Sequence, residues 1–237
     1  MVYRWLESIQ EILFPTRCRL CLAPGVRGLE LCAGCIADLP RIESACQRCG
    51  RPTPGTDVLL CGRCLTRPPA YDHCLALFAY DYPVEFLVHR IKYADDLALA
   101  RSLGRLLLER VEGSVNVRPD CLVPVPLHRR RLSERGYNQS LELARPFQNC
   151  GFTLDTDCCM RTRATPAQTG LPAATRRTNV RNAFAVSRPV AGEHVALIDD
   201  VLTTGSTLNE LALTLKRAGA RRVDVWVVAR TLQPPNR

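Results

Sequence analysis

The chain has 237 residues, a hydrophobic fraction of 46 % and a formal net charge of +9. This length accommodates one medium-sized α/β domain plus a small additional module, and the composition is that of a globular protein rather than a disordered one. The positive charge favours anionic partners, nucleic acids among them. No stretch approaches the ~20 apolar residues of a membrane span.

The first fourteen residues carry Arg4, Glu7 and Glu11. These are too many charges for the apolar centre of a signal peptide. The segment instead predicts a short amphipathic helix that ends near Pro15. We therefore expect a cytoplasmic protein.

Thirteen cysteines in a cytoplasmic chain indicate metal binding before disulfides. Two CxxC turns, each directing two thiolates at one point, complete a tetrahedral zinc site. The ten residues between Cys21 and Cys32 and the eleven between Cys49 and Cys61 suit successive zinc ribbons. We therefore predict two structural zinc ions, with the CxxC pairs combined in sequential order. The eight predicted ligands are Cys18, Cys21, Cys32, Cys35, Cys46, Cys49, Cys61 and Cys64.

Other uses of these cysteines stay open. An interleaved pairing of the four CxxC turns is an alternative, and redox or iron–sulfur chemistry is another. The ordinary role of an all-cysteine zinc site is to fold a segment too short for a core of its own, and contact with nucleic acid or a partner would add to it. The other five cysteines lack ligand spacing and are expected as core or surface thiols: Cys74, Cys121, Cys150, Cys158 and Cys159.

A proline-containing stretch over residues 66–70 predicts a linker. We accordingly expect an N-terminal module over residues 1–66, comprising the helix and a double zinc ribbon, and an α/β domain over residues 71–237. The beginning of this domain is predicted to contain a strand at 74–80, a helix opened by Pro83, a helix capped by Asp95 or Asp96 and running to about Glu112, and a strand at 121–125.

Positive charge gathers just past the strand at 121–125. Arg129, Arg130 and Arg135 lie in a predicted turn over residues 128–135, and another helix follows Ser140. Basic residues at a strand end suit an anionic group such as pyrophosphate. A solvated basic turn and a nucleic-acid patch are the alternatives.

Residues 160–182 are arginine-rich and have little apolar periodicity; Arg176 and Arg177 belong to this stretch. Long segments of this kind in compact domains are functional lids or disordered connectors. A basic lid would exclude water and neutralise an anionic leaving group. A flexible connector with incidental arginines is the alternative.

The most informative stretch is 195–207. The apolar run 195–198 predicts a buried strand with Asp199 and Asp200 at its carboxyl end, followed by the loop 203–207 and a helix for which Thr207 and Glu210 fit a capping box. With a second buried strand at 223–229 this forms a right-handed βαβ unit, whose crevice lies at the carboxyl ends of the strands. A helix N-terminus cradles phosphate and carboxylates accept hydrogen bonds from sugar hydroxyls, so the stretch predicts a site for 5-phosphorylated ribose. A solvated acidic pair in an ordinary strand-turn-helix is the alternative.

This stretch closely resembles the 5-phosphoribosyl-1-pyrophosphate (PRPP) signature of type I phosphoribosyltransferases. The resemblance implies that Asp199 and Asp200 hold the ribose 2- and 3-hydroxyls. It also implies a 5-phosphate site, composed of Thr203, Thr204, Gly205, Ser206 and Thr207. If the protein is catalytic, Mg2+ would bridge the pyrophosphate and ribose hydroxyls. Arginines would stabilise the departing pyrophosphate, with Arg129, Arg130, Arg135, Arg176 and Arg177 as candidates.

Across nearly its whole length the chain resembles the ComF family. The matching features are the cysteine turns and the stretches 13–15, 89–93, 123–128 and 135–139, with Gln168, Arg177, Asn179, Ala183 and Phe184. The resemblance implies a type I phosphoribosyltransferase-like fold, a parallel sheet flanked by helices, behind the zinc ribbons. It also implies a cytoplasmic role in natural competence, helping imported single-stranded DNA through the inner membrane.

Three functions follow from these features. The first is an enzyme that displaces pyrophosphate from C1 of PRPP. The second is a non-catalytic factor that holds single-stranded DNA, with PRPP as a regulator or relic. Such binders usually offer aromatic stacking platforms, and the zinc segment 18–64 contains no Phe, Tyr or Trp. The third is an assembly adaptor of the DNA-uptake machinery that docks on a helicase or membrane channel.

Overall fold

The computed structural model describes residues 16–55, 57–115, 117–164 and 180–232. Two short helices, α2 (Ala33–Ala37) and α3 (Gly62–Thr66), belong to the cysteine-rich part of the chain. The elements that follow are β1 (His73–Ala79), α4 (Val84–Tyr93), α5 (Leu97–Glu112), β2 (Cys121–Pro124), α6 (Arg129–Arg135), α7 (Gln139–Asn149), β3 (Cys159–Arg161), β4 (Phe184–Val186), β5 (His194–Leu202), α9 (Ser206–Arg217) and β6 (Arg222–Arg230). The predicted helix over the first fourteen residues lies outside the described residues.

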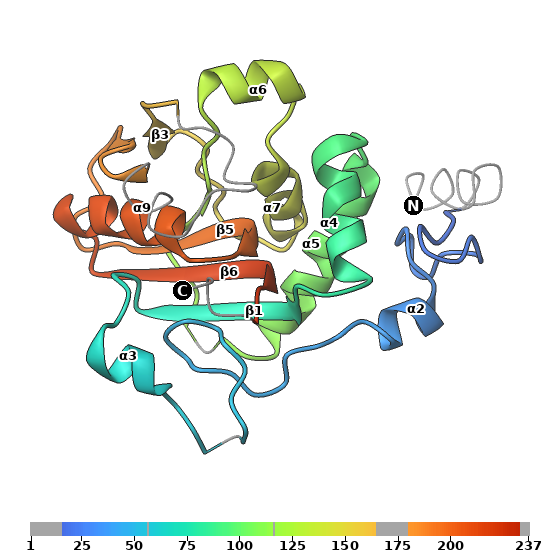
Figure 1. The fold of residues 1–237 in the computed structure, drawn as a ribbon. Coiled ribbons are helices and arrows are strands. Elements are labelled where there is room, and N and C mark those ends of the chain that lie inside the picture. Colours follow the sequence, from blue (N-terminus) through green and yellow to red (C-terminus); the bar gives the residue numbers. More distant parts are fainter. Residues whose placement is uncertain (1–15, 56, 116, 165–179, 233–237) are drawn as a thin grey trace.

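A parallel sheet with strand order β1-β6-β5-β2 forms the centre of the α/β domain (Figure 1). Its two inner strands are buried on both faces. On β5, Ala196 and Ile198 face the core shared with α4, α5 and α7, whereas Val195 and Leu197 face the core shared with α9. Burial on both faces explains why the sequences of these two strands are continuous apolar runs rather than alternating patterns. The predicted βαβ unit and mixed α/β class are confirmed.

The helices predicted between the first two strands are confirmed. The side chains of Val84, Leu87, Val88 and Ile91 form the buried face of α4. The Asp96 carboxylate caps α5 by accepting a hydrogen bond from the backbone N–H of Leu99 at 3.2 Å. A side-chain oxygen at this position satisfies one of the unpaired N–H groups of the first turn.

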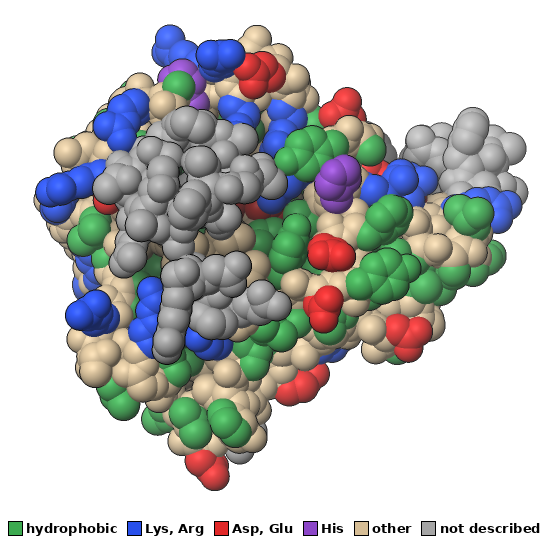
Figure 2. All heavy atoms as spheres, in the orientation of Figure 1, with side chains coloured by type: hydrophobic (Ala, Val, Ile, Leu, Met, Phe, Trp, Pro, Cys, Tyr) green, Lys and Arg blue, Asp and Glu red, His purple; other side chains and the backbone are tan. Residues whose placement is uncertain are grey.

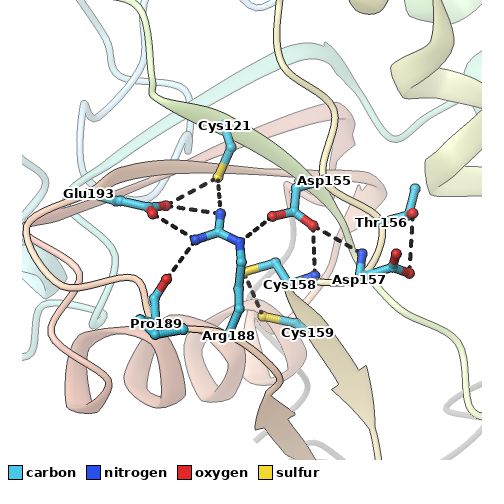
Figure 3. A network of polar contacts seen from close by, with 9 residues as sticks. All are labelled: Cys121, Asp155, Thr156, Asp157, Cys158, Cys159, Arg188, Pro189 and Glu193. Carbon is cyan, nitrogen blue, oxygen red and sulfur yellow. Dashed lines mark hydrogen bonds and ion pairs between the residues drawn. The ribbon is translucent and has the colours of Figure 1, made fainter.

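A two-stranded antiparallel ribbon, β3 with β4, was not predicted from the sequence. It flanks the arginine-rich excursion, whose residues 165–179 lie outside the described part of the chain. Arg188 fixes the chain where it returns from the ribbon: its guanidinium forms ion pairs of 2.6 Å with both Asp155 and Glu193 and contacts the Cys121 sulfur at 3.4 Å (Figure 3). Glu193 lies in the same loop as Arg188, Asp155 lies in the loop before β3, and Cys121 belongs to β2, so one side chain connects three segments.

The segment between the two cysteine clusters covers the outer edge of the sheet. The backbone N–H of Ile42 donates to the carbonyl of Leu77, and the N–H of Ala79 donates to the carbonyl of Pro40, at 3.0 and 2.8 Å. Residues 40–42 therefore run antiparallel beside β1 (Figure 1). Unpaired edge strands promote association between chains, so this segment protects the sheet. The division into modules at residues 66–71 stays a prediction.

Among the described residues, no helix combines the length and apolar character that a membrane crossing requires.

Candidate functional site

A cleft of about 360 Å³ lies at the carboxyl ends of the strands. One wall contains the end of β5, the loop after it and the beginning of α9. The opposite side comes from α4, α6, the beginning of α7 and β3. The polar and charged residues of the lining are Tyr80, His89, Lys92, Tyr93, Arg131, Arg135, Gln139, Ser140, Arg161, Asp199, Asp200, Thr203, Ser206 and Thr207. The crevice expected from the βαβ unit is therefore present.

The two predicted sugar-binding carboxylates lie side by side, but in different surroundings. Asp199 is partly exposed to the cleft and its Oδ1 accepts hydrogen bonds from the Ser140 hydroxyl and the Asp200 backbone N–H, both at 2.9 Å. Asp200 is 4 % exposed. Its Oδ2 atom lies 3.1 Å from the ammonium nitrogen of Lys92. The acidic pair therefore carries an internal counter-ion.

Burial and the charge of Asp200 raise the pKa of Asp199 to about 7. Lys92 and the Ser140 hydroxyl act in the opposite direction but do not cancel this effect. For Lys92, burial disfavours the ammonium, yet the charges of Asp200 and Asp199 outweigh burial and raise its pKa above the ordinary value. Lys92 therefore stays positively charged near neutral pH, while Asp199 titrates there.

The predicted phosphate loop leads directly into α9. Gly205 is the N-cap, and its φ of +80° lies in the left-handed region that favours glycine. The predicted capping box was wrong: α9 begins at Ser206, and Glu210 instead accepts a hydrogen bond from the backbone N–H of Asn182 at 2.7 Å. The Thr204 hydroxyl lies 2.8 Å from the Ser206 hydroxyl and orders the loop behind the cleft. Since the first N–H groups of a helix lack intrahelical acceptors, this terminus suits a phosphate.

The basic stretch after β2 is a helix, α6, where a turn was expected. Within it Arg131 and Arg135 line the cleft. Arg129 is exposed, and Arg130 points into solvent, paired with Glu134 at 2.9 Å, so neither belongs to the lining. Figure 2 shows Lys and Arg side chains gathered over α6 at this end of the molecule. Arg176 and Arg177 lie outside the described residues.

Arg161 of β3 lines the cleft on the same side as α6. Its guanidinium lies 5.5 Å from the centre of the Phe184 ring. Burial and the neighbouring charge of Arg131 lower the pKa of Arg161. The guanidinium groups of Arg131 and Arg161 repel each other. An anion bound between them would relieve this repulsion. Arg131, Arg135 and Arg161 therefore form the cationic side of the cleft.

Residues 135–139 connect the elements around the cleft. The Tyr137 hydroxyl donates to the backbone carbonyl of Ile91, next to Lys92. Asn138 caps α7 through the N–H of Ser140 and donates to the carbonyl of Val125, at 3.0 and 3.1 Å. The motif thus fixes the end of α4 and the start of α7, the two elements that place Lys92 and Ser140 against the acidic pair.

The eight CxxC cysteines form two separate groups, and within each group the sulfur atoms lie within 4.8 Å of one another. The first group contains Cys18, Cys21, Cys32 and Cys35, and the second contains Cys46, Cys49, Cys61 and Cys64. The sequential pairing is therefore confirmed, and four sulfur donors at this spacing fit a tetrahedral zinc ion. Of the other cysteines, Cys74, Cys121, Cys158 and Cys159 are buried and Cys150 is exposed, as expected for thiols without a ligand role.

The acidic pair is not arranged as a direct ligand of Mg2+, and the Mg2+ expected to bridge the pyrophosphate and the ribose hydroxyls stays a prediction. Mg2+ requires oxygen ligands in a near-octahedral arrangement at about 2.0–2.1 Å. Here the Lys92 ammonium already neutralises Asp200, and the Asp200 Oδ2 atom is buried beneath it. Asp199 Oδ1 is engaged by two hydrogen bonds.

The parallel sheet and the two cysteine groups define a mixed α/β protein with an N-terminal double zinc ribbon. Residues 9–65 match the model of the double zinc ribbon domain. The chain is 39 % identical to DNA utilization protein YhgH of Salmonella typhi, covering 92 % of this chain and 98 % of that protein. It is 35 % identical to competence protein F of Haemophilus influenzae, over 84 % and 90 % of the two chains. The chain therefore belongs to the ComF family of these relatives.

Solved structures with a similar fold include two phosphoribosyltransferases. The purine phosphoribosyltransferase from Pyrococcus horikoshii has a TM-score of 0.34 and 17 % identity, over 64 % of this chain and 80 % of that chain. The hypoxanthine phosphoribosyltransferase from Trypanosoma cruzi has a TM-score of 0.36 and 16 % identity, over 65 % and 79 %. These scores reflect a loose resemblance, and the family assignment rests on the sequence relatives.

Sequence reasoning missed Lys92, Ser140 and Gln139 as lining residues, and it did not separate Arg131 and Arg161 from the other arginines. The signal for Lys92 was its place in the stretch 89–93, one of the stretches that resemble the ComF family. Ser140 directly follows the similar stretch 135–139.

Proposed function

We propose that the cleft binds PRPP, with the ribose hydroxyls at Asp199 and Asp200, the 5-phosphate at the N-terminus of α9 and the pyrophosphate toward the arginines. One observation carries this proposal: a carboxylate pair, a helix N-terminus and three guanidinium groups face a single cleft. The carboxylates suit neutral hydroxyls, and the two cationic ends suit the two phosphate groups of such a ligand.

In a transfer reaction the bond between C1 and the pyrophosphate oxygen breaks, and pyrophosphate leaves with the electron pair. A nucleophilic atom of the acceptor forms the new bond to C1. Arg131, Arg135 and Arg161 would stabilise the negative charge on the leaving group. Asp199 and Asp200 would orient the sugar so that C1 faces the open part of the cleft.

We place this chemistry in the handling of DNA in the cytoplasm, because the curated relatives are named for DNA utilization and competence. The zinc module would then be structural, holding two zinc ions. A helicase or an inner-membrane channel of the uptake machinery would be the protein partner.

Calorimetric titration of the zinc-loaded protein tests this proposal. Ribose 5-phosphate and PRPP should both bind, whereas 2-deoxyribose 5-phosphate should bind about tenfold more weakly because it lacks one hydroxyl for the acidic pair. A screen for pyrophosphate release over candidate acceptors then separates turnover from binding alone. If neither phosphosugar binds, the proposal fails.

Single-strand binding without catalysis is a second candidate, favoured by a stripe of exposed aromatic side chains at Tyr82 and on α4. Tyr82, Phe86 and Tyr93 are 72, 41 and 59 % exposed, and Figure 2 shows hydrophobic side chains over this helix. The His89 and Tyr93 rings, 4.5 Å apart, reach the edge of the cleft. Bases stack on such rings with little sequence preference.

Phe86→Ala combined with Tyr93→Ala tests the stripe by fluorescence anisotropy with labelled oligothymidylate. If single strands are held there, affinity should fall about tenfold or more, while ribose 5-phosphate still binds. Leu132→Ala, an exposed apolar position on α6, is the matched control. Unchanged affinity in the double variant would exclude the stripe as a platform.

A further inference from the structure

The sugar-hydroxyl end of the cleft contains a fixed positive charge. Lys92 is one of two lysines in the chain. Its side chain is 25 % exposed and its ammonium nitrogen contacts Asp200 Oδ2, an oxygen that accepts no hydrogen bond from the described residues. This contact is therefore an ion pair whose carboxylate side is sealed from solvent.

The position of this ammonium is set by the fold. Lys92 lies in the last turn of α4, between buried Ile91 and the cleft residue Tyr93. The hydroxyl of Tyr137 holds the backbone at Ile91, so the end of the helix is attached to the loop that leads into α7. The side chain of Lys92 therefore reaches Asp200 from a helix end whose backbone is held by a hydrogen bond.

The charges at this end of the cleft are nearly balanced before any ligand enters. Two carboxylates face one ammonium, and burial together with Asp200 raises the pKa of Asp199 to about 7, which favours the neutral form of this carboxyl group. A divalent cation would bring two more positive charges next to Lys92. Such a cation and the Lys92 ammonium would repel each other strongly, because the site is partly buried.

We propose that Lys92 supplies the cation of the sugar-hydroxyl site, so that a 5-phosphorylated ribose binds here without a divalent metal ion. The ammonium keeps the Asp200 carboxylate in place and lends a donor to a ribose hydroxyl, while Asp199 accepts from or donates to the second hydroxyl. This inference rests on the proposed function, since it assigns the cation for the same ligand.

Titration of the full zinc-loaded protein with ribose 5-phosphate tests the inference, because this ligand lacks the pyrophosphate that chelates Mg2+ by itself. Dialysis against resin-treated buffer removes Mg2+ and, unlike a strong chelator in solution, spares the cysteine-bound zinc. We expect the dissociation constant of the wild-type protein to change less than about twofold between Mg2+-free buffer and millimolar Mg2+.

Lys92→Met should weaken binding about 10- to 100-fold in Mg2+-free buffer, and added Mg2+ should restore part of the loss. Lys92→Arg keeps the charge and should stay independent of Mg2+. Lys216→Met is the matched control, because this second lysine pairs with Asp72 on the surface, away from the cleft. Zinc content and circular dichroism show whether each variant is folded.

The outcomes are distinct. Binding by the wild-type protein only when Mg2+ is present would overturn the inference and leave the proposed function intact. Unaltered Mg2+-free binding by a folded Lys92→Met variant would overturn it as well. If the wild-type protein binds neither ribose 5-phosphate nor PRPP under either condition, the proposed function itself is wrong.

Discussion

The Ser140 hydroxyl donates a 2.9 Å hydrogen bond to Asp199 Oδ1, joining the first turn of α7 to the end of β5. Ser140 is fully buried, and its helix is capped by the preceding Asn138. The orientation of the Asp199 carboxylate therefore depends on α7, which contributes only Gln139 and Ser140 to the cleft lining.

Ser140→Ala should weaken the binding of ribose 5-phosphate several-fold, since a hydrogen bond to a charged group contributes roughly 1.5–3 kcal/mol. The pKa of Asp199 should rise further, because the hydroxyl is one of the groups that hold it down. Binding measured from pH 6 to 8 reports both effects. Ser133→Ala, on the exposed side of α6, should leave them unchanged.

Replacing Asp199 and Asp200 together by Asn keeps their shape and removes the negative charge. Affinity for PRPP should fall by about one to two orders of magnitude for the pair, because hydrogen bonds to charged groups contribute roughly 1.5–3 kcal/mol. Calorimetry measures the loss, and zinc content shows that the fold survives. Asp157→Asn, at an exposed carboxylate, is the control. Undiminished affinity would remove the acidic pair from the site.

The pKa of Asp199, raised from an ordinary value of 3.8 to about 7, predicts a pH-dependent stability. Between these values the folded state retains a proton that the unfolded state releases, so the free energy of unfolding falls as pH rises. Asp199→Asn lacks this effect. Its stability relative to the wild-type protein should grow by at least about 1 kcal/mol from pH 5 to pH 8 in urea unfolding. A constant difference would contradict the raised pKa.

Two neighbouring arginines of α6 should differ in their effect on PRPP. Arg131 lines the cleft, whereas Arg130 pairs with Glu134 in solvent. Arg131→Gln should weaken PRPP binding about tenfold and ribose 5-phosphate binding much less, because only PRPP carries the pyrophosphate. Arg130→Gln should affect neither ligand. Equal losses for the two ligands would place Arg131 at the 5-phosphate instead.

Elemental analysis of protein purified without chelator should find two zinc ions per chain. Cys18→Ser and Cys61→Ser should each lose about one ion, since they belong to different clusters. Cys150→Ser, at an exposed cysteine outside both clusters, should retain two. A zinc-free wild-type protein would defeat this prediction.

The parts of the fold that could be predicted are those with a strong local pattern. The buried face of α4 and the apolar runs of β5 and β6 follow directly from periodicity and hydrophobicity. The helix α6 was missed because none of its residues is buried, so it has no apolar period to detect. The start of α9 was misplaced because Gly205 caps it through backbone conformation, which a search for side-chain caps overlooks.

The candidate site was predictable along the segment 199–207 and, for Arg135, along the basic stretch after β2. The residues from Asp199 to Thr207 are consecutive in the sequence, so the motif that they form can be recognised from the sequence alone. Lys92 meets Asp200 only through the packing of α4 on the sheet, and Arg161 enters the cleft only because β3 pairs with β4. Contacts between distant segments of this kind leave no spacing signal in a single sequence.

If the two cysteine groups hold zinc, the antiparallel contact of residues 40–42 with β1 makes the amount of folded protein depend on the zinc supply of the cell. This segment lies between the two cysteine groups. Loss of zinc from them would release the segment and leave the β1 edge open to other chains. Because a ligand of the folded state stabilises it by mass action, zinc starvation should shift newly made chains toward aggregation and proteolysis. The soluble fraction of this protein in zinc-limited cells would then fall before any change at the phosphosugar cleft itself.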